Sequence, residues 1–394
     1  MSITLEKTFL RIGIVPLADA APIVVAQAKG FFTRYGLEVE IALERAWAAV
    51  RDKVAADRLD AAQMLAPMPI AATLGLDAVQ VPMLTALTLN LNGNAIVVSN
   101  SLHSRLLTMQ RPNEIGALGW AQALKRVIEA DRATGRPLPV FAHVYPFSAH
   151  HYELRYWLAA AGIRPDHDLN LIVVPPPQAV AQLEAGRIDG FCVGAPWGEV
   201  AESIGVGRRI VSKFQIWNNS PEKVLGVTRE WAETHPNTHL AMIAAIIDAG
   251  RWLDQPENRA EAARLLSDGR YLDASPDCVV SALTIRPQEN DFGPGLVFHT
   301  GAAGFPWVSQ AQWFIQQMRR WQPLPKDIDA GRIAAEVYRP DLYRAAAERA
   351  GVAFPLIDAK TEGTHAAAWT LESTRGTIVM GPDRFFDGAV FPGR

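Results

Sequence analysis

Cysteine is scarce in this chain of 394 residues, which contains only Cys192 and Cys278. Two cysteines cannot form the disulfide framework that stabilises small secreted domains. Cys192 stands in the apolar segment GFCVG, a setting that predicts a buried free thiol. Stability must therefore come from a hydrophobic core, and a hydrophobic content of 49% is enough to build one.

Long apolar runs are missing as well. Without a run of about 18 apolar residues, a membrane-spanning helix is not expected. The first residues, MSITLEKTF, do not have the basic, apolar and cleavage segments of a secretory signal. We therefore expect a cytoplasmic protein, unless a leader precedes this sequence in the native gene. A formal net charge of −3, spread along the chain, predicts no direct binding to nucleic acid or to a membrane.

One pattern is present twice, in residues 10–67 and 140–196, and each copy reads strand, helix, strand, helix, strand. Each copy has a proline after its first strand, an Arg-x-Asp turn and a final Ala-Pro. The first proline and the Asp are 44 residues apart in one copy and 43 in the other. A match of several features in register indicates a duplicated unit. Such units build parallel sheets flanked by helices, so we expect two α/β lobes.

In open α/β sheets, small ligands bind at the carboxyl ends of the strands, beside helix N-termini. Four strand-to-helix turns therefore mark a candidate cleft for a small anion; they follow Pro16, Pro67, Pro146 and Pro196. We expect a discontinuous first lobe formed by residues 1–98 and 224–330, with a strand over 94–100 at the end of its first part. The second lobe spans 99–223, and 331–394 form a helical extension and a wrapping tail.

The sequence closely resembles the nitrate-binding and bicarbonate-binding proteins of bacterial ABC importers. The resemblance covers nearly the whole chain and depends on segments that include KGFFTRYGLEVEI, WAAVRDKV, LDAAQMLAPMPIAATLGL, VVPPPQAVAQLEAGRIDGFCVG and PEKVLGV. It implies a type II periplasmic-binding-protein fold, in which two Rossmann-like lobes are joined by two crossing strands and the ligand binds in the interlobe cleft.

Because no signal segment is recognised, the sequence is most similar to the cytoplasmic nitrate/nitrite sensor branch, NasS. The resemblance then implies a partner, a NasT-like response-regulator antiterminator that binds RNA and is released when the sensor binds its ligand. The alternative is a nitrate- or bicarbonate-binding protein of an ABC importer without its leader.

Nitrate is a flat anion with weak acceptors, so its site needs a desolvated cation, neutral donors and a planar wall. Lys223, in PEKVLG, matches the family's anion-binding lysine, and a bound anion would offset the cost of burying its charge. The alternative for Lys223 is a solvated side chain beside Glu222. Trp47, in AWAAVRDK, matches a family tryptophan whose indole N–H can donate and whose ring can cover the anion.

The resemblance places further candidate donors at two places. Asn92 and Asn94 flank Gly93 where the importers carry Gln-Gly-Gln, although Asn-Gly is also typical of a tight turn. His150 matches a family histidine at a helix start, but His151 follows it directly, and either imidazole could bind the ligand or cap the helix. Two residues beside strand-to-helix turns complete the candidate set: Pro67 and Trp197.

Ala195 stands where the import receptors usually carry Glu, and this loss removes a possible calcium ligand. Few acidic residues lie near the turns in sequence, so a site with six to eight oxygen ligands is not expected. We therefore expect no metal and no cofactor, and favour nitrate or nitrite over bicarbonate. A lyase-like or desulfinase-like enzyme is the remaining class. It is disfavoured because neither cysteine lies at a turn and no catalytic motif is recognised.

Overall fold

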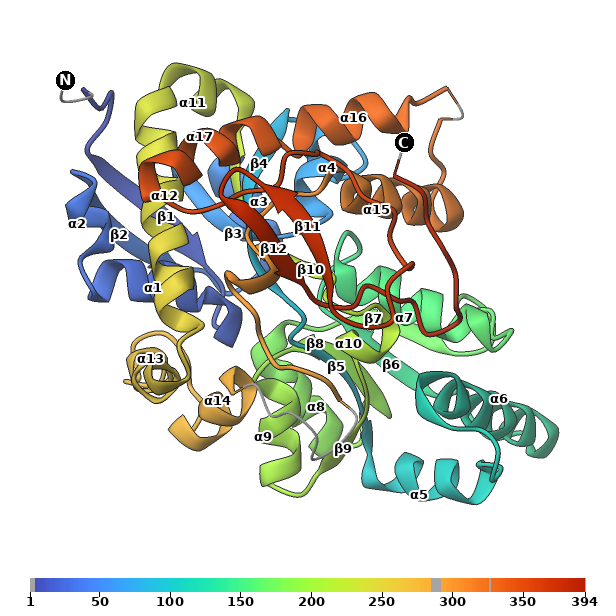
Figure 1. Ribbon diagram of the computed structural model, residues 1–394. Helices are drawn as coiled ribbons and strands as arrows, with labels where there is room; N and C mark the ends of the chain where they lie inside the picture. The colour runs from blue at the N-terminus through green and yellow to red at the C-terminus, as the bar shows by residue number, and fades with distance from the viewer. Residues whose placement is uncertain (1–3, 285–291, 326, 394) are drawn as a thin grey trace.

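The computed structural model describes residues 4–284, 292–325 and 327–393, which form two α/β lobes with a C-terminal extension (Figure 1). Each lobe has a five-stranded sheet, and the strand orders are β2-β1-β3-β10-β4 and β7-β6-β8-β5-β9. The first sheet contains β1 (Phe9–Ile14), β2 (Glu38–Leu43), β3 (Ala61–Leu65), β4 (Met83–Leu91) and β10 (Pro221–Thr228). The second contains β5 (Asn94–Ser99), β6 (Val140–His143), β7 (Asn170–Val173), β8 (Gly190–Gly194) and β9 (Gly207–Ser212).

Helices cover both sheets. Those of the first lobe are α1 (Ala21–Ala28), α2 (Phe31–Arg34), α3 (Trp47–Ala55), α4 (Met68–Leu74), α11 (Arg229–Thr234), α12 (Pro236–Leu253), α13 (Arg259–Leu266), α14 (Pro276–Leu283) and α15 (Val308–Trp321), with the short 3₁₀ turn η1 (Ala18–Ala20) before α1. Those of the second are α5 (Asn100–Met109), α6 (Gly116–Thr134), α7 (Ala149–Ala160), α8 (Ala179–Glu184), α9 (Trp197–Ser203) and α10 (Lys213–Ile216). Among the described residues, the longest helices are too short or too polar to cross a membrane.

The duplicated pattern of the sequence corresponds to a duplicated structure. The orders β2-β1-β3 and β7-β6-β8 are equivalent, and the strands in each trio are parallel. The Asp of each Arg-x-Asp turn accepts a hydrogen bond from the first strand of its copy of the pattern. Asp60 accepts the backbone N–H of Arg11 at 2.9 Å, and Asp189 accepts that of Val140 at 2.8 Å. Each carboxylate thus ties the turn to the first strand of its lobe, which explains why the motif recurs.

The boundary between the lobes differs from the sequence-based expectation. Strand β5 pairs with β8 and β9, so it belongs to the second sheet and not to the end of the first lobe. Strand β10 begins at Pro221 and pairs antiparallel with β3 and β4. Both strands come directly from the opposite lobe and run against their neighbours, so each sheet is mixed and not wholly parallel. Apolar periodicity does not reveal which sheet accepts a crossing strand.

Two short segments, 92–93 and 217–220, connect the lobes. Asn92 and Asn219 both have positive φ, 62° and 51°, in the left-handed region that Asn tolerates better than most residues. The Asn92 amide donates to Oδ1 of Asn219 at 3.2 Å, and the backbone N–H of Asn92 donates to Ser220. The two connections are therefore hydrogen-bonded to each other and form one hinge.

The C-terminal extension contains α16 (Ala330–Val337), α17 (Pro340–Ala350) and a hairpin of β11 (Trp369–Ser373) and β12 (Gly376–Met380), shown in red in Figure 1. Beyond the hairpin the tail packs against the hinge. The rings of Phe385 and Trp217 stack with centroids 4.9 Å apart, and the Tyr156 hydroxyl donates to Asp387 at 2.7 Å. The helical pair and the wrapping tail are as expected, whereas the hairpin is not foreseen from the sequence.

Candidate functional site

Lys223 lies on β10, between β3 and the edge strand β4 of the first sheet, and its side chain is fully buried. Its ammonium lies 2.8 Å from a carboxylate oxygen of Asp19 and 2.8 Å from one of Glu222. The alternative of a solvated lysine is therefore wrong. The expectation of a buried cation that waits for an anion also needs correction, because Lys223 already has two anionic partners from its own chain.

Glu222 connects Lys223 to the second lobe. Its carboxylate accepts from the amide of Asn94 on β5 and lies 3.1 Å from the ammonium of Lys213 on α10. Lys213 in turn pairs with Glu153 on α7, and all these side chains are buried. A chain of ionic contacts thus runs from η1 of the first lobe, through β10, to α7 of the second.

The acidic residues of this network correct the expectation that carboxylates are scarce at the cleft. Asp19, Glu153 and Glu222 are distant in sequence and meet only in the folded chain. They are paired with two lysines, Lys213 and Lys223, and none of the His, Cys, Asp and Glu groupings in the described part of the chain is arranged to hold a metal ion. The network therefore gives no support to a calcium site.

Burial dominates the electrostatics of the network. Removal from water raises the pKa of Asp19 despite the neighbouring Lys223. Burial lowers the pKa of Lys223, but the two carboxylates outweigh it and the net shift is upward. Burial raises the pKa of Glu222, yet His150 and the two lysines hold it below its usual value. At neutral pH the Lys223 and Glu222 pair is therefore ionised.

Glu153 gives a prediction on pH and stability. Burial, only partly opposed by Lys213, raises its pKa from 4.5 to about 7. Between these values the folded chain binds more protons than the unfolded chain at this group, so its contribution to stability falls as pH rises. The variant Glu153→Gln should have a flatter pH dependence of the unfolding free energy over that window, as measured by urea unfolding. Parallel wild-type and variant curves would contradict the shifted pKa.

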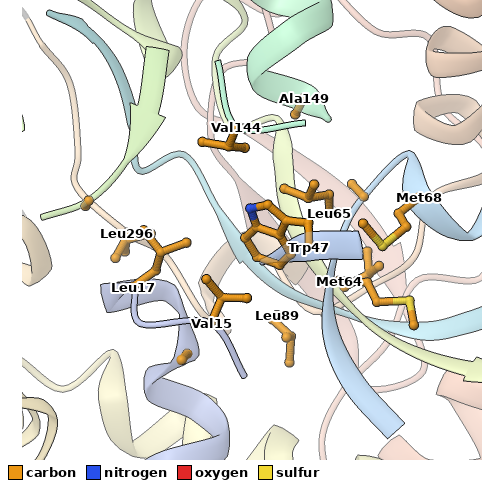
Figure 2. Close-up of a cluster of buried hydrophobic side chains, with 14 of the residues drawn as sticks. Val15, Leu17, Trp47, Met64, Leu65, Met68, Leu89, Val144, Ala149 and Leu296 are labelled. Atoms are coloured by element: carbon orange, nitrogen blue, oxygen red, sulfur yellow. The ribbon is translucent and has the colours of Figure 1, made fainter. Parts of the chain in front are cut away.

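Trp47 begins α3 and is 1% exposed. Its ring lies 5.3 Å from the Lys223 ammonium. Figure 2 shows it among apolar side chains, with the indole nitrogen directed toward Val144 and Ala149 of the second lobe. This nitrogen is buried and has no hydrogen-bond partner among the described residues. A buried N–H without an acceptor is costly, which points to an acceptor that is not part of the protein.

His150, in the first turn of α7, is fully buried, and neither ring nitrogen has a hydrogen-bond partner in the described structure. Its Nδ1 lies 3.2 Å from a Glu222 oxygen, but outside hydrogen-bond geometry. Burial lowers its pKa to about 3, so the imidazole is neutral and offers one N–H. His151 differs, because its Nδ1 lies 3.2 Å from Nε2 of His143. Of the two candidates, His150 is the one beside Lys223 and Glu222.

The other predicted residues divide into two groups. Asn94 reaches Glu222, whereas Asn92 is occupied at the hinge. Both line a cavity of about 130 Å³. Pro67 precedes α4 and Trp197 begins α9, where its indole nitrogen is buried without a hydrogen-bond partner among the described residues. No hydrogen bond or ring contact joins Pro67 or Trp197 to Lys223 in the described structure.

Two site residues are missed in the sequence. Asp19 follows Pro16, which marks one of the expected strand-to-helix turns, so an acidic residue there was a detectable signal. Gln63 on β3 carries no such signal. Its amide donates to Asp19, and its oxygen accepts the backbone N–H of Val15 at 2.8 Å. Gln63 therefore fixes the Asp19 carboxylate in front of Lys223.

The lobes touch beside the site. The backbone N–H of Ala18 donates to Ala195 of the second lobe at 2.9 Å. Nearby, the Arg51 guanidinium donates to the hydroxyl of Tyr145 at 2.6 Å, and this hydroxyl in turn donates to Asp77. Arg51 and Asp77 belong to the first lobe and Tyr145 to the second. The described conformation is therefore a closed one.

The Tyr145 contact gives a second prediction. Tyr145→Phe removes the hydroxyl that joins the lobes and should destabilise the closed form by about 1 kcal/mol. We expect a several-fold weaker anion affinity and a larger radius of gyration in small-angle scattering of the unliganded chain. Tyr156→Phe is the matched control, because its hydroxyl bonds to the tail at Asp387. Equal effects of both variants would show that Tyr145 has no special part in closure.

Comparison with known proteins identifies the family. Residues 4–267 match the model of the NMT1-like family. The chain belongs to this family. It is 31% identical over 397 residues to the nitrate/nitrite binding protein NrtA of Nostoc, and the match covers 98% of this chain and 83% of that protein. It is also 31% identical over 408 residues to the bicarbonate-binding protein CmpA of Synechococcus elongatus, with 98% and 84% covered.

The structural comparison agrees. The periplasmic nitrate-binding protein NrtA of Synechocystis superposes with a TM-score of 0.85 at 28% identity, over 99% of this chain and 97% of that one. The sulphonate-binding protein SsuA of Escherichia coli, with a TM-score of 0.58 at 16% identity, shares the fold alone. The expected periplasmic-binding-protein fold is thus confirmed.

Some relatives are much longer than this chain. The nitrate import ATP-binding protein NrtC of Synechocystis is 36% identical over 364 residues, which are 88% of this chain and 51% of that protein. The chain therefore spans about half the length of these ATP-binding relatives.

Proposed function

We propose that the NMT1-like family member described here binds nitrate or nitrite in its interlobe cleft, as a cytoplasmic sensor whose closure controls a NasT-like antiterminator. One observation carries the binding part. Two buried donors have no acceptor among the described residues: the Trp47 indole, whose ring lies beside the buried ammonium of Lys223, and the His150 imidazole, which lies beside Glu222, the partner of Lys223. One acceptor-rich molecule at this place would satisfy both donors.

The chemistry of the site suits a small flat oxyanion. The donors are neutral, and Trp47 lies in a cluster of buried apolar side chains that also contains Leu17 and Val144 (Figure 2). Sulfate carries two charges and would be repelled more strongly by the carboxylates around Lys223. A substrate-binding receptor for nitrate or bicarbonate is the alternative, and it is supported by the names of the NrtA and CmpA relatives.

The binding proposal is tested by isothermal titration of the purified chain with nitrate, nitrite, hydrogencarbonate with and without Ca²⁺, and sulfate, all at one ionic strength. We expect micromolar affinity for nitrate or nitrite, about −8 kcal/mol, and no heat from sulfate. Binding of hydrogencarbonate alone would favour the bicarbonate alternative. If none of the anions binds, the proposed function is wrong.

The sensor part is supported by the two-lobed form. Residues from both lobes meet at the hinge and at the Tyr145 contact, so a change of lobe angle alters the surface offered to a partner.

The test of the sensor part uses the chain and a purified NasT-like antiterminator. We expect a complex in size-exclusion chromatography without nitrate and separate proteins at saturating nitrate. We also expect the native protein in the soluble cytoplasmic fraction of its cells. Recovery from the periplasm, with no complex in either condition, would replace the sensor with the import receptor.

A further inference from the structure

The buried network around Lys223 has an excess of negative charge before any ligand arrives. Its ionisable members are Lys213 and Lys223 against Asp19, Glu153 and Glu222, so the fully ionised network carries a charge of −1. The neutral His150 does not change this sum. Because every member is buried, water screens these charges poorly.

An anion beside Lys223 makes the imbalance larger. Before the anion binds, the excess negative charge can be relieved at Glu153, which is bonded to Lys213 and takes up a proton near neutral pH because burial raises its pKa to about 7. A bound monoanion restores the excess negative charge at the Lys223 end of the network, beside Asp19 and Glu222. Nitrate can accept hydrogen bonds but cannot donate, so it cannot form a hydrogen bond with either carboxylate. Like charges at contact distance disfavour joint ionisation.

We infer that the cleft takes up its anion together with one proton, and that Asp19 holds this proton. This inference rests on the proposed function and deepens it. Asp19 and Glu222 are both in contact with Lys223, but they differ in the number of groups that stabilise the ionised carboxylate. Glu222 faces Lys213, Lys223, the Asn94 amide and His150, whereas the partners of Asp19 are Lys223 and the Gln63 amide. Protonation of Asp19 therefore costs less electrostatic stabilisation than protonation of Glu222.

Within the described ranges of the chain, Lys223 is the ionisable group in contact with Asp19. Strand β3 contributes Gln63 and β8 approaches with Gly194, while β10 supplies Lys223 and Glu222. From α7, His150 lies against Glu222, and the Cys192 thiol on β8 is kept protonated by burial, which raises its pKa. The burial that already raises the pKa of Asp19 acts in the same direction as a bound anion.

A second consequence separates the two ligand classes of the family. Hydrogencarbonate carries its own O–H and can donate it to Asp19, so its binding needs no proton from solution. Nitrate must recruit one. In the pH range where Asp19 is ionised in the free chain and protonated in the complex, nitrate affinity should fall about tenfold for each unit of pH increase. Hydrogencarbonate affinity should not follow this slope.

The experiment counts protons. Nitrate is titrated into the chain at about pH 6, 7 and 8, each time in two buffers with different ionisation enthalpies, and the difference in heat gives the protons taken up. We expect close to one proton per nitrate in the wild type and close to none in Asp19→Asn. Nitrate binding to the wild type without proton uptake overturns the inference but leaves the proposed function intact. Binding of no anion at any pH overturns both.

Two further variants locate the proton. Glu362 is a matched control, because it is a fully buried carboxylate paired with a lysine, Lys360, in the C-terminal tail. Glu362→Gln should keep the uptake of the wild type. In Glu153→Gln the uptake should also persist; its loss there, with retention in Asp19→Asn, would overturn the assignment to Asp19. Thermal unfolding checks that each variant is folded, and the wild-type proton count decides the inference even if a variant is not.

Discussion

Replacing Lys223 with methionine will weaken nitrate binding by roughly 2–5 kcal/mol and will also lower the stability of the unliganded chain. The second effect follows from the contacts of the ammonium. Lys223 neutralises Asp19 and Glu222, and its loss leaves two buried carboxylates without their shared cation. Isothermal titration measures the first effect and urea unfolding the second.

The two effects of this variant can be separated. Lys213→Met also removes a buried lysine from Glu222, but on the side of Glu153, so stability should fall while nitrate affinity falls much less. In the double variant Lys223→Met with Asp19→Asn, part of the stability should return because one unpaired charge is gone, without a return of affinity. Equal losses of affinity in the two single lysine variants would show that Lys223 is structural.

Replacing Trp47 with phenylalanine will weaken nitrate binding by about 1.5–3 kcal/mol, the contribution of a hydrogen bond to a charged group. The substitution keeps an aromatic ring and removes a donor that has no acceptor within the described residues. Because no internal hydrogen bond is lost, the variant should be destabilised only through the smaller ring. The measurement is nitrate titration together with thermal unfolding.

Trp157→Phe is the matched control for this prediction. Trp157 is also buried, but its indole N–H donates to the carbonyl of Ala117 at 2.7 Å. Its removal leaves a carbonyl unpaired, so stability should fall with little change in affinity. If Trp47→Phe binds nitrate as tightly as the wild type, the unpaired indole is not a ligand donor.

The fold was predictable from the sequence to a large extent, because the duplicated strand and helix pattern can be recognised in the sequence. The register between Pro16 and Asp60 and between Pro146 and Asp189 reflects a real hydrogen bond from each Asp to the first strand. The crossing strands were harder. The apolar sequence of strand β5 would suit the sheet of either lobe, and its pairing with β8 shows that it belongs to the second. The β11–β12 hairpin is short and half exposed, so its pattern is weak.

The site was predictable residue by residue only where a motif existed. Lys223, Trp47 and His150 come together as the resemblance implies, although their ligand role stays a prediction. The charge balance of the buried network around Lys223 could not be predicted from the sequence. Asp19 and Lys223 are 204 positions apart, and their contact depends on the pairing of β10 with β3. A property that arises from several distant groups, such as a network charge of −1, cannot be read from any single motif.

The most direct test of the account follows the indole N–H of Trp47 by NMR during a nitrate titration, with its resonance assigned by Trp47→Phe. The account predicts that this resonance shifts and saturates with the same affinity as the titration heat, because the anion accepts its hydrogen bond. Saturation of nitrate binding with an unchanged Trp47 resonance would contradict a ligand site at Lys223, Trp47 and His150.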